Sequence, residues 1–145
     1  MKISRILATK GKGVTTIRPD QTVRESIAMM ENHNIGALPV VNPAGKLVGI
    51  ITERDIIRHL VDNEELFVLT VAEIMTKEVI TGLAQDDLDS VAVTMTEKRF
   101  RHLPIMLGDT LVGIVSIGDV VKAQRDEFRG AVDTLQTQIG EEDGG

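Results

Sequence analysis

Gly49-Ile50-Ile51-Thr52-Glu53-Arg54-Asp55 returns 64 residues later as Gly113-Ile114-Val115-Ser116-Ile117-Gly118-Asp119. Upstream of each copy, Leu38-Pro39-Val40 returns as Leu103-Pro104-Ile105, 65 residues later. The one-residue difference falls in the turn between the two motifs, which is where copies of one supersecondary unit tolerate a change in length. Two similar units side by side create a pseudo-symmetric cleft, and a cleft is the expected place for a ligand.

Composition restricts the classes of function. The chain of 145 residues has a net charge of −6, no cysteine, no Trp or Tyr and three Phe. The negative charge and the shortage of aromatic rings argue against a partner nucleic acid or a membrane surface. Without cysteine there are no disulfides or thiolate metal sites, and the three histidines are too scattered to indicate a metal cluster. No apolar run approaches the roughly 20 residues of a spanning helix. We therefore expect a soluble cytoplasmic protein.

Each copy reads as strand, helix, strand, turn, strand, helix. In the first, Thr22 and Glu25 form a capping-box pattern at the start of a helix. The predicted strands are 14–17, 38–41 and 46–51, the last two as an antiparallel hairpin, and a second helix covers 55–61. The second copy repeats this order, with Asp87 at the cap position, strands at 79–81, 103–107 and 111–115, and a helix at 119–123.

A short amphipathic lead-in precedes each copy, at 3–9 and at 71–76. We therefore divide the chain into a first repeat at 1–69, a second repeat at 70–125, and a C-terminal segment at 126–145. That segment carries the apolar spacing of a short amphipathic helix, at Phe128, Val132, Leu135 and Ile139. The helix either packs on the protein's own core or pairs with a partner chain. Residues 141–145 are expected to be disordered.

These duplicated motifs resemble the CBS domain, and nearly the whole chain resembles a stand-alone tandem pair of CBS domains, a Bateman module. The resemblance implies an α+β fold in which two βαββα repeats pack about a pseudo-twofold axis, here with an added C-terminal amphipathic helix. It also implies a regulatory module that binds an adenosine-containing ligand, such as AMP, ADP, ATP, NAD(H) or S-adenosylmethionine. Modules of this kind usually pair into flat homodimers.

Both copies place a hydroxyl and an aspartate three residues apart at a strand-to-helix junction, Thr52 with Asp55 and Ser116 with Asp119. Helix capping alone would account for the hydroxyl. It accounts less well for the acid, because reciprocal capping boxes favour the longer Glu or Gln. A short carboxylate at a helix start can accept the hydroxyls of a ribose, and the resemblance implies that role for the aspartate.

The only dense basic stretch in this acidic chain is 98–102. It is either a solvated face, the usual outcome for a run of charges, or a phosphate grip, because a guanidinium offers a fork of donors to phosphate oxygens. Arg101 and His102 lead directly into the strand at 103–107, and the first repeat has Gly36 and Ala37 at the matching places. The Asp55 site is therefore expected to gain basic groups that the Asp119 site lacks.

The adenine ring is expected between apolar strands, beside the small residues that allow close approach. His33 and His59 are expected to be surface residues near helix ends. The full set of predicted nucleotide-binding residues is Thr15, Gly36, Ala37, Pro39, Thr52, Arg54, Asp55, Arg99, Arg101, His102, Pro104, Ser116 and Asp119.

Three classes of function remain in view. The favoured one is a ligand-sensing module that binds an adenine nucleotide, forms a homodimer and acts on a regulated protein that the sequence does not name. The second is a ligand-free interaction module that acts through dimerisation with a partner protein. An enzyme is disfavoured, because the sequence offers no nucleophile–base pair, metal cluster or glycine-rich phosphate loop; no catalytic residue, catalytic cofactor or metal is predicted.

Overall fold

The computed structural model describes residues 1–11 and 13–143. The first repeat contains α2 (Val23–His33), β1 (Ala37–Val41), β2 (Leu47–Thr52) and α3 (Glu53–Leu60). Thr22 caps α2 by accepting a hydrogen bond from the amide of Glu25, as the capping-box pattern predicts. A short 3₁₀ helix, η1 (Leu66–Val68), and α4 (Val71–Ile74) follow and lead into the second repeat.

The second repeat repeats this order with α5 (Leu88–Lys98), β3 (His102–Leu107), β4 (Thr110–Ser116) and α6 (Ile117–Asp143). Both hairpins are antiparallel and in the same register. Ala37 pairs with Thr52 in the first, and His102 pairs with Ser116 in the second. Leu38 and Leu103, one residue further along, are both buried. The predicted α+β fold of two matching repeats is confirmed.

The first predicted strand of each repeat is shorter than expected. The run 14–17 meets the sheet only through a parallel bridge between Ile17 and Val40, and the run 79–81 is followed by a similar bridge between Gly82 and Ile105. At these bridges the chain runs parallel to β1 and to β3 without forming a longer ladder. The two sheets are therefore two-stranded, each with one extra point of pairing.

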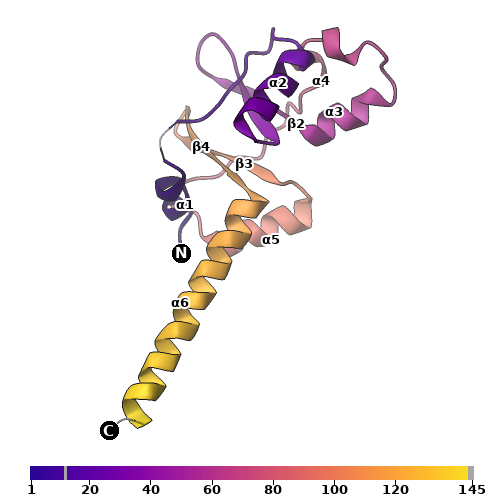
Figure 1. Cartoon of the computed structure of the whole chain (residues 1–145). Coiled ribbons are helices and arrows are strands. Elements are labelled where there is room, and N and C mark those ends of the chain that lie inside the picture. The colour runs from indigo at the N-terminus through magenta and orange to yellow at the C-terminus, as the bar shows by residue number, and fades with distance from the viewer. Residues whose placement is uncertain (12, 144–145) are drawn as a thin grey trace.

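The lead-in helices exchange places between the repeats. α1 (Ile3–Lys10) contributes Ile3 and Ile6 to the core of the second repeat, beside Leu88 and Val115. α4 contributes Val71 and Ile74 to the core of the first repeat. Figure 1 shows α1, in indigo, beside β4 and α6, while α4 lies with α2 and α3. Each repeat is thus completed by a helix that belongs to the other part of the sequence.

α6 is a single helix where the sequence suggested two segments, because the helical pattern continues without a break from 117 onward. α6 ends at Asp143, and 144–145 lie outside the described residues, so the expected disorder of 141–145 stays a prediction from the sequence. Figure 1 shows the C-terminal part of α6 extending away from both repeats. Phe128 and Leu135 are exposed over 70% and 59% of their surface. These two side chains therefore do not pack on the protein's own core; the side chain of Ile139 lies outside the described residues.

Candidate functional site

The aspartate of the first repeat closes a capping box. The amide of Asp55 donates to Thr52 Oγ1 at 3.2 Å, and Asp55 Oδ2 accepts from both the amide and the hydroxyl of Thr52 at 3.0 Å. The expectation from the sequence that capping accounts less well for the acid than for the hydroxyl is wrong. The N-cap amide lies within reach of the short carboxylate, so capping accounts for the acid as well as for the hydroxyl.

The second oxygen of the same carboxylate has a partner from another element. Thr76, just after α4, donates its hydroxyl to Asp55 Oδ1 at 3.0 Å. Asp55 is one of two buried polar residues in the part of the chain that the structure describes, with 8% of its surface exposed. Sequence reasoning missed Thr76, since it lies 21 positions away and only the pairing of Ile50 with Thr76 brings it to this carboxylate.

The second repeat builds the same junction with a different partner. The amide of Asp119 donates to Ser116 Oγ at 3.1 Å, and Asp119 Oδ2 accepts from the amide of Ser116 at 2.9 Å. The ammonium of Lys10 donates to the same Oδ2 at 2.7 Å. Burial acts to raise the pKa of Asp119, but the hydrogen bonds from Lys10 and Ser116 outweigh it and hold the pKa below its usual value. Lys10 is a second residue that the sequence analysis missed.

A cleft of about 1240 Å³ lies where the first repeat faces the basic stretch of the second. It brings together seven of the thirteen predicted residues: Gly36, Thr52, Arg54, Asp55, Arg99, Arg101 and His102. Arg101 is exposed and His102 is half-buried. The cleft thus joins a buried carboxylate from one repeat with basic side chains from the other.

The other six predicted residues do not line this cleft: Thr15, Ala37, Pro39, Pro104, Ser116 and Asp119. Ala37, Pro39 and Pro104 are buried within β1 and β3. None of the six lines a smaller cleft of about 680 Å³ between the C-terminal end of α1 and the hairpin turns. Contact of these residues with a ligand stays a prediction from the sequence.

The lining of the larger cleft contains both apolar and charged side chains. Sequence reasoning missed its apolar members, among them Met30, Ile50, Val79, Ile80 and Phe100. A flat ring would find its apolar contacts there. The charged members are four carboxylates and four guanidiniums, namely Glu31, Glu53, Asp55 and Glu78 with Arg54, Arg58, Arg99 and Arg101.

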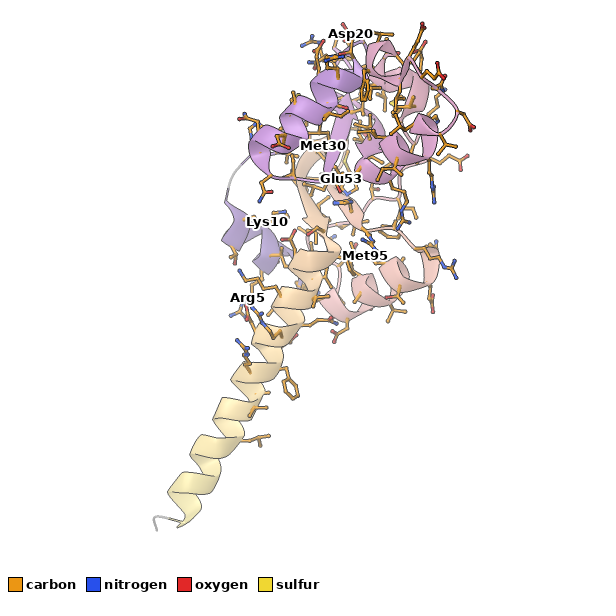
Figure 2. All side chains as sticks on the ribbon, turned by 45° about the vertical axis from the view of Figure 1, so that its right-hand side comes forward. Arg5, Lys10, Asp20, Met30, Glu53 and Met95 are labelled. Atoms are coloured by element: carbon orange, nitrogen blue, oxygen red, sulfur yellow. The ribbon has the colours of Figure 1, made fainter. Side chains whose placement is uncertain are left out.

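Glu53 and His102 both line this cleft and interact electrostatically. The carboxylate of Glu53 lies over Gly36, where an added Cβ would come within 3.2 Å of it. In Figure 2 Glu53 is found where the first repeat faces the second. Burial lowers the pKa of His102 below 6.5; Glu53 and Asp119 oppose this effect, while Lys10 and Arg101 add to it. His102 is therefore favoured in its neutral form, in which the imidazole can both donate and accept a hydrogen bond.

The other two histidines lie near helix ends, as expected. His33 is the exposed last residue of α2, whereas His59 is partly buried and its Nδ1 lies 2.8 Å from the carbonyl oxygen of Asp55. Across the described residues, no three His, Asp or Glu side chains are grouped so that they could hold a metal ion. No helix among those residues is long and apolar enough to cross a membrane.

Two duplicated βαββα units with a cleft between them define a paired-repeat module. A family model of the CBS domain matches residues 7–62 and 71–126, so the chain belongs to the CBS-domain family and holds two such domains. Paired CBS domains are regulatory ligand-binding modules.

Known relatives share this architecture. The CBS domain-containing protein YhcV of Bacillus subtilis is 34% identical over 122 residues, covering 84% of this chain and 86% of YhcV. The crystal structure of the CBS-domain protein ATU1752 of Agrobacterium tumefaciens is 35% identical with a TM-score of 0.83, covering 86% of this chain and 99% of that one. The CBS domain pair of protein MJ0100, solved with 5′-methylthioadenosine and S-adenosyl-L-methionine, is 32% identical with a TM-score of 0.78; the match covers 88% of this chain and 98% of that one.

Proposed function

We propose that this protein is a regulatory module that binds an adenine nucleotide, namely AMP, ADP, ATP or NAD(H), in the cleft beside Asp55. The observation that carries the proposal is that one cleft is lined by the buried Asp55 at a helix start and by Arg101 and His102 from the opposite repeat. This arrangement offers a carboxylate to a ribose and guanidinium donors to a phosphate. The apolar lining offers a place for the adenine ring.

The chemistry of the relative with a bound ligand supports the nucleoside part of this proposal. The MJ0100 pair holds 5′-methylthioadenosine and S-adenosyl-L-methionine, both of which contain adenosine. The mixed charge of the cleft here suits a ligand that presents both anionic and hydroxyl groups. We propose a regulatory protein without catalytic activity of its own, and its cytoplasmic location stays a prediction from the sequence.

Thermal-shift and calorimetric titrations test the proposal, with AMP, ADP, ATP, NAD(H) and S-adenosylmethionine as ligands and GMP as the matched control for the base. A ligand at 100 times its Kd stabilises the fold by about 2.7 kcal/mol. We expect at least one adenosine compound to raise the melting temperature, and GMP to leave it unchanged. If none of the five compounds binds at millimolar concentration, the ligand-free interaction module becomes the better account.

We also propose that the protein is a homodimer in which α6 pairs with its copy. Val121, Phe128 and Leu135 are exposed over 56%, 70% and 59% of their surface. They are spaced seven residues apart on α6, which is the repeat of helices that pair along an apolar seam. These three residues share Phe128 and Leu135 with the set predicted from the sequence, and they add Val121 at the start of the exposed seam. A second copy of α6 carries the same apolar repeat and can cover it.

A further inference from the structure

The two repeats offer equivalent carbonyl groups beside their aspartates. Ile50 pairs with Pro39 in the first hairpin, and Ile114 pairs with Pro104 in the second. Each isoleucine lies two residues before the hydroxyl residue that caps the next helix. Any group that bridges Ile50 to Asp55 therefore has a counterpart that bridges Ile114 to Asp119.

In the first repeat one threonine makes this bridge. The amide of Thr76 donates to the carbonyl of Ile50 at 2.9 Å, and its hydroxyl donates to Asp55 Oδ1 at 3.0 Å. Thr76 can do so because α4 has only four residues and the chain is extended at Met75, directly before Thr76. The backbone is then free to pair with β2.

In the second repeat a lysine side chain makes both contacts. Lys10 Nζ donates to the carbonyl of Ile114 at 2.9 Å and to Asp119 Oδ2 at 2.7 Å. α1 remains helical for eight residues, through Lys10, so its backbone does not extend along β4 as that of Thr76 does along β2. The ammonium at the end of α1 therefore reaches the equivalent carbonyl and the equivalent carboxylate. It bonds Oδ2 of Asp119, the oxygen that also accepts from Ser116, whereas Thr76 bonds Oδ1 of Asp55.

The exchange of a hydroxyl for an ammonium changes what the carboxylate can still bind. A neutral hydroxyl leaves the negative charge of Asp55 to attract the hydroxyls of an incoming ribose. The ammonium of Lys10 neutralises Asp119 with a short charge-assisted bond, and the pair is only partly exposed, with 39% of the lysine and 25% of the aspartate side chain accessible. A ribose would have to displace this cation.

We propose that the side chain of Lys10 occupies the position beside Asp119 that a ribose would otherwise take, which we call the second half-site. Lys10 thereby confines adenosine-ligand binding to the first half-site, in the Asp55 cleft. The inference rests on the proposed function, since it concerns which of two equivalent half-sites takes the ligand. Lys10 is therefore a specificity-determining residue whose removal opens a second site on the same chain.

The experiment is calorimetric titration of the full chain with adenosine, which lacks a phosphate and so tests the ribose contact alone. Wild type is expected to bind one adenosine per chain, and Lys10→Met to bind two. Removal of one charge-assisted competitor should tighten binding at the Asp119 site by about tenfold or more. The double variant Lys10→Met with Asp119→Ala should return to one site.

Three further variants separate the role of the charge from a general effect on the fold. Lys10→Arg keeps the cation and should keep one site, whereas Lys10→Gln, which retains a hydrogen-bonding side chain, should open the second. Lys2→Met is the matched control, because Lys2 also donates to a backbone carbonyl, that of Gln85 at 3.0 Å, away from Asp119. Melting curves of each variant report whether it is folded.

The outcomes distinguish this inference from the proposed function. Two sites in wild type, or no site gained over wild type in both Lys10→Met and Lys10→Gln, would overturn the role of Lys10. Wild type that binds no adenosine while Lys10→Met binds one through Asp119 would support the role of Lys10 and remove the proposed Asp55 site.

Discussion

Leu7 and Met75 fill equivalent places in the two repeats. Leu7 on α1 lies where the side chain of Gly113 would be, and Met75 after α4 lies where the side chain of Gly49 would be. Both glycines are in the second strand of their hairpin and both are buried. The glycine that opens each duplicated motif is thus required for the lead-in of the other repeat to approach the sheet.

The two glycines differ in what a methyl group would meet. A Cβ at Gly49 would come within 2.5 Å of Met75 Sδ and 2.9 Å of the carbonyl oxygen of Thr76, whereas at Gly113 the close contact is with the end of the Leu7 side chain. A flexible side chain can move, but the backbone of Thr76 is paired with Ile50. We expect Gly49→Ala to lower the free energy of unfolding by about 1–3 kcal/mol. Gly113→Ala should lower the free energy of unfolding by a smaller amount, and urea unfolding measures both variants. A larger loss in Gly113→Ala than in Gly49→Ala would contradict the prediction.

The two aspartates should differ in their effect on ligand binding. Asp55→Ala is expected to remove most high-affinity AMP binding, because Asp55 lines the large cleft with Arg101 and His102. Asp119→Ala should leave it largely intact. Both variants lose the carboxylate that accepts from the amide of the capping residue, so urea unfolding should show some loss of stability in each. If Asp55→Ala and Asp119→Ala lose AMP affinity equally in calorimetry, the basic stretch does not make the Asp55 site the tighter one.

Arg101 should discriminate between phosphorylated and unphosphorylated ligands. A charge-assisted bond to phosphate is worth roughly 1.5–3 kcal/mol. Arg101→Ala should therefore weaken AMP binding by about tenfold or more, while adenosine binding changes little. Arg5→Ala, an exposed arginine on α1, is the control. Parallel calorimetric titrations measure both ligands, and an equal loss for AMP and adenosine would exclude a phosphate contact.

The lowered pKa of His102 predicts how stability depends on pH. Burial disfavours the charged imidazole in the folded protein, so below pH 6.5 the unfolded chain binds more protons than the folded one. The contribution of His102 is fully present above that pH and falls as the pH drops toward the folded pKa. Urea unfolding at pH 7.5 and 5.5 should show this loss, and His102→Gln should reduce it. His33→Gln, at the exposed end of α2, should not reduce it.

The exposed seam of α6 should control the oligomeric state. Phe128→Ser removes the most exposed of its three apolar residues, and we expect the protein to shift from dimer to monomer at tens of micromolar in light scattering. Arg129→Ser changes the adjacent exposed residue, which lies outside the seam, and should remain dimeric. Wild-type protein that is monomeric at this concentration would rule out a stable homodimer.

The repeats and their hairpins could be predicted because the pattern is local. The continuous buried runs around Leu38 and Leu103, and the caps at Thr22 and Asp87, depend on residues within a few positions of one another. The pairing of Asp55 with the basic stretch could also be predicted, because two similar repeats face each other. The role of the aspartate in binding a ribose came from the family resemblance.

The partners of the two aspartates could not be predicted in the same way. Thr76 and Lys10 reach Asp55 and Asp119 only because α4 and α1 end at different points in their equivalent paths. Helix length at such a boundary depends on packing and not on local propensity alone. The exchange of the lead-in helices has the same origin, since a strand-and-helix pattern does not say which of two similar cores a short helix will enter.

That exchange ties the stability of each half to the presence of the other. Val71 and Ile74 complete one core and Ile3 and Ile6 complete the other, so a chain cut between the repeats would leave both cores open at one side. The two halves should therefore unfold in a single cooperative transition. A ligand that stabilises one cleft then shifts the folding equilibrium of the whole molecule. This includes the part of α6 that α1 contacts. A module with this connectivity can report an event in one repeat at a helix that emerges from the other.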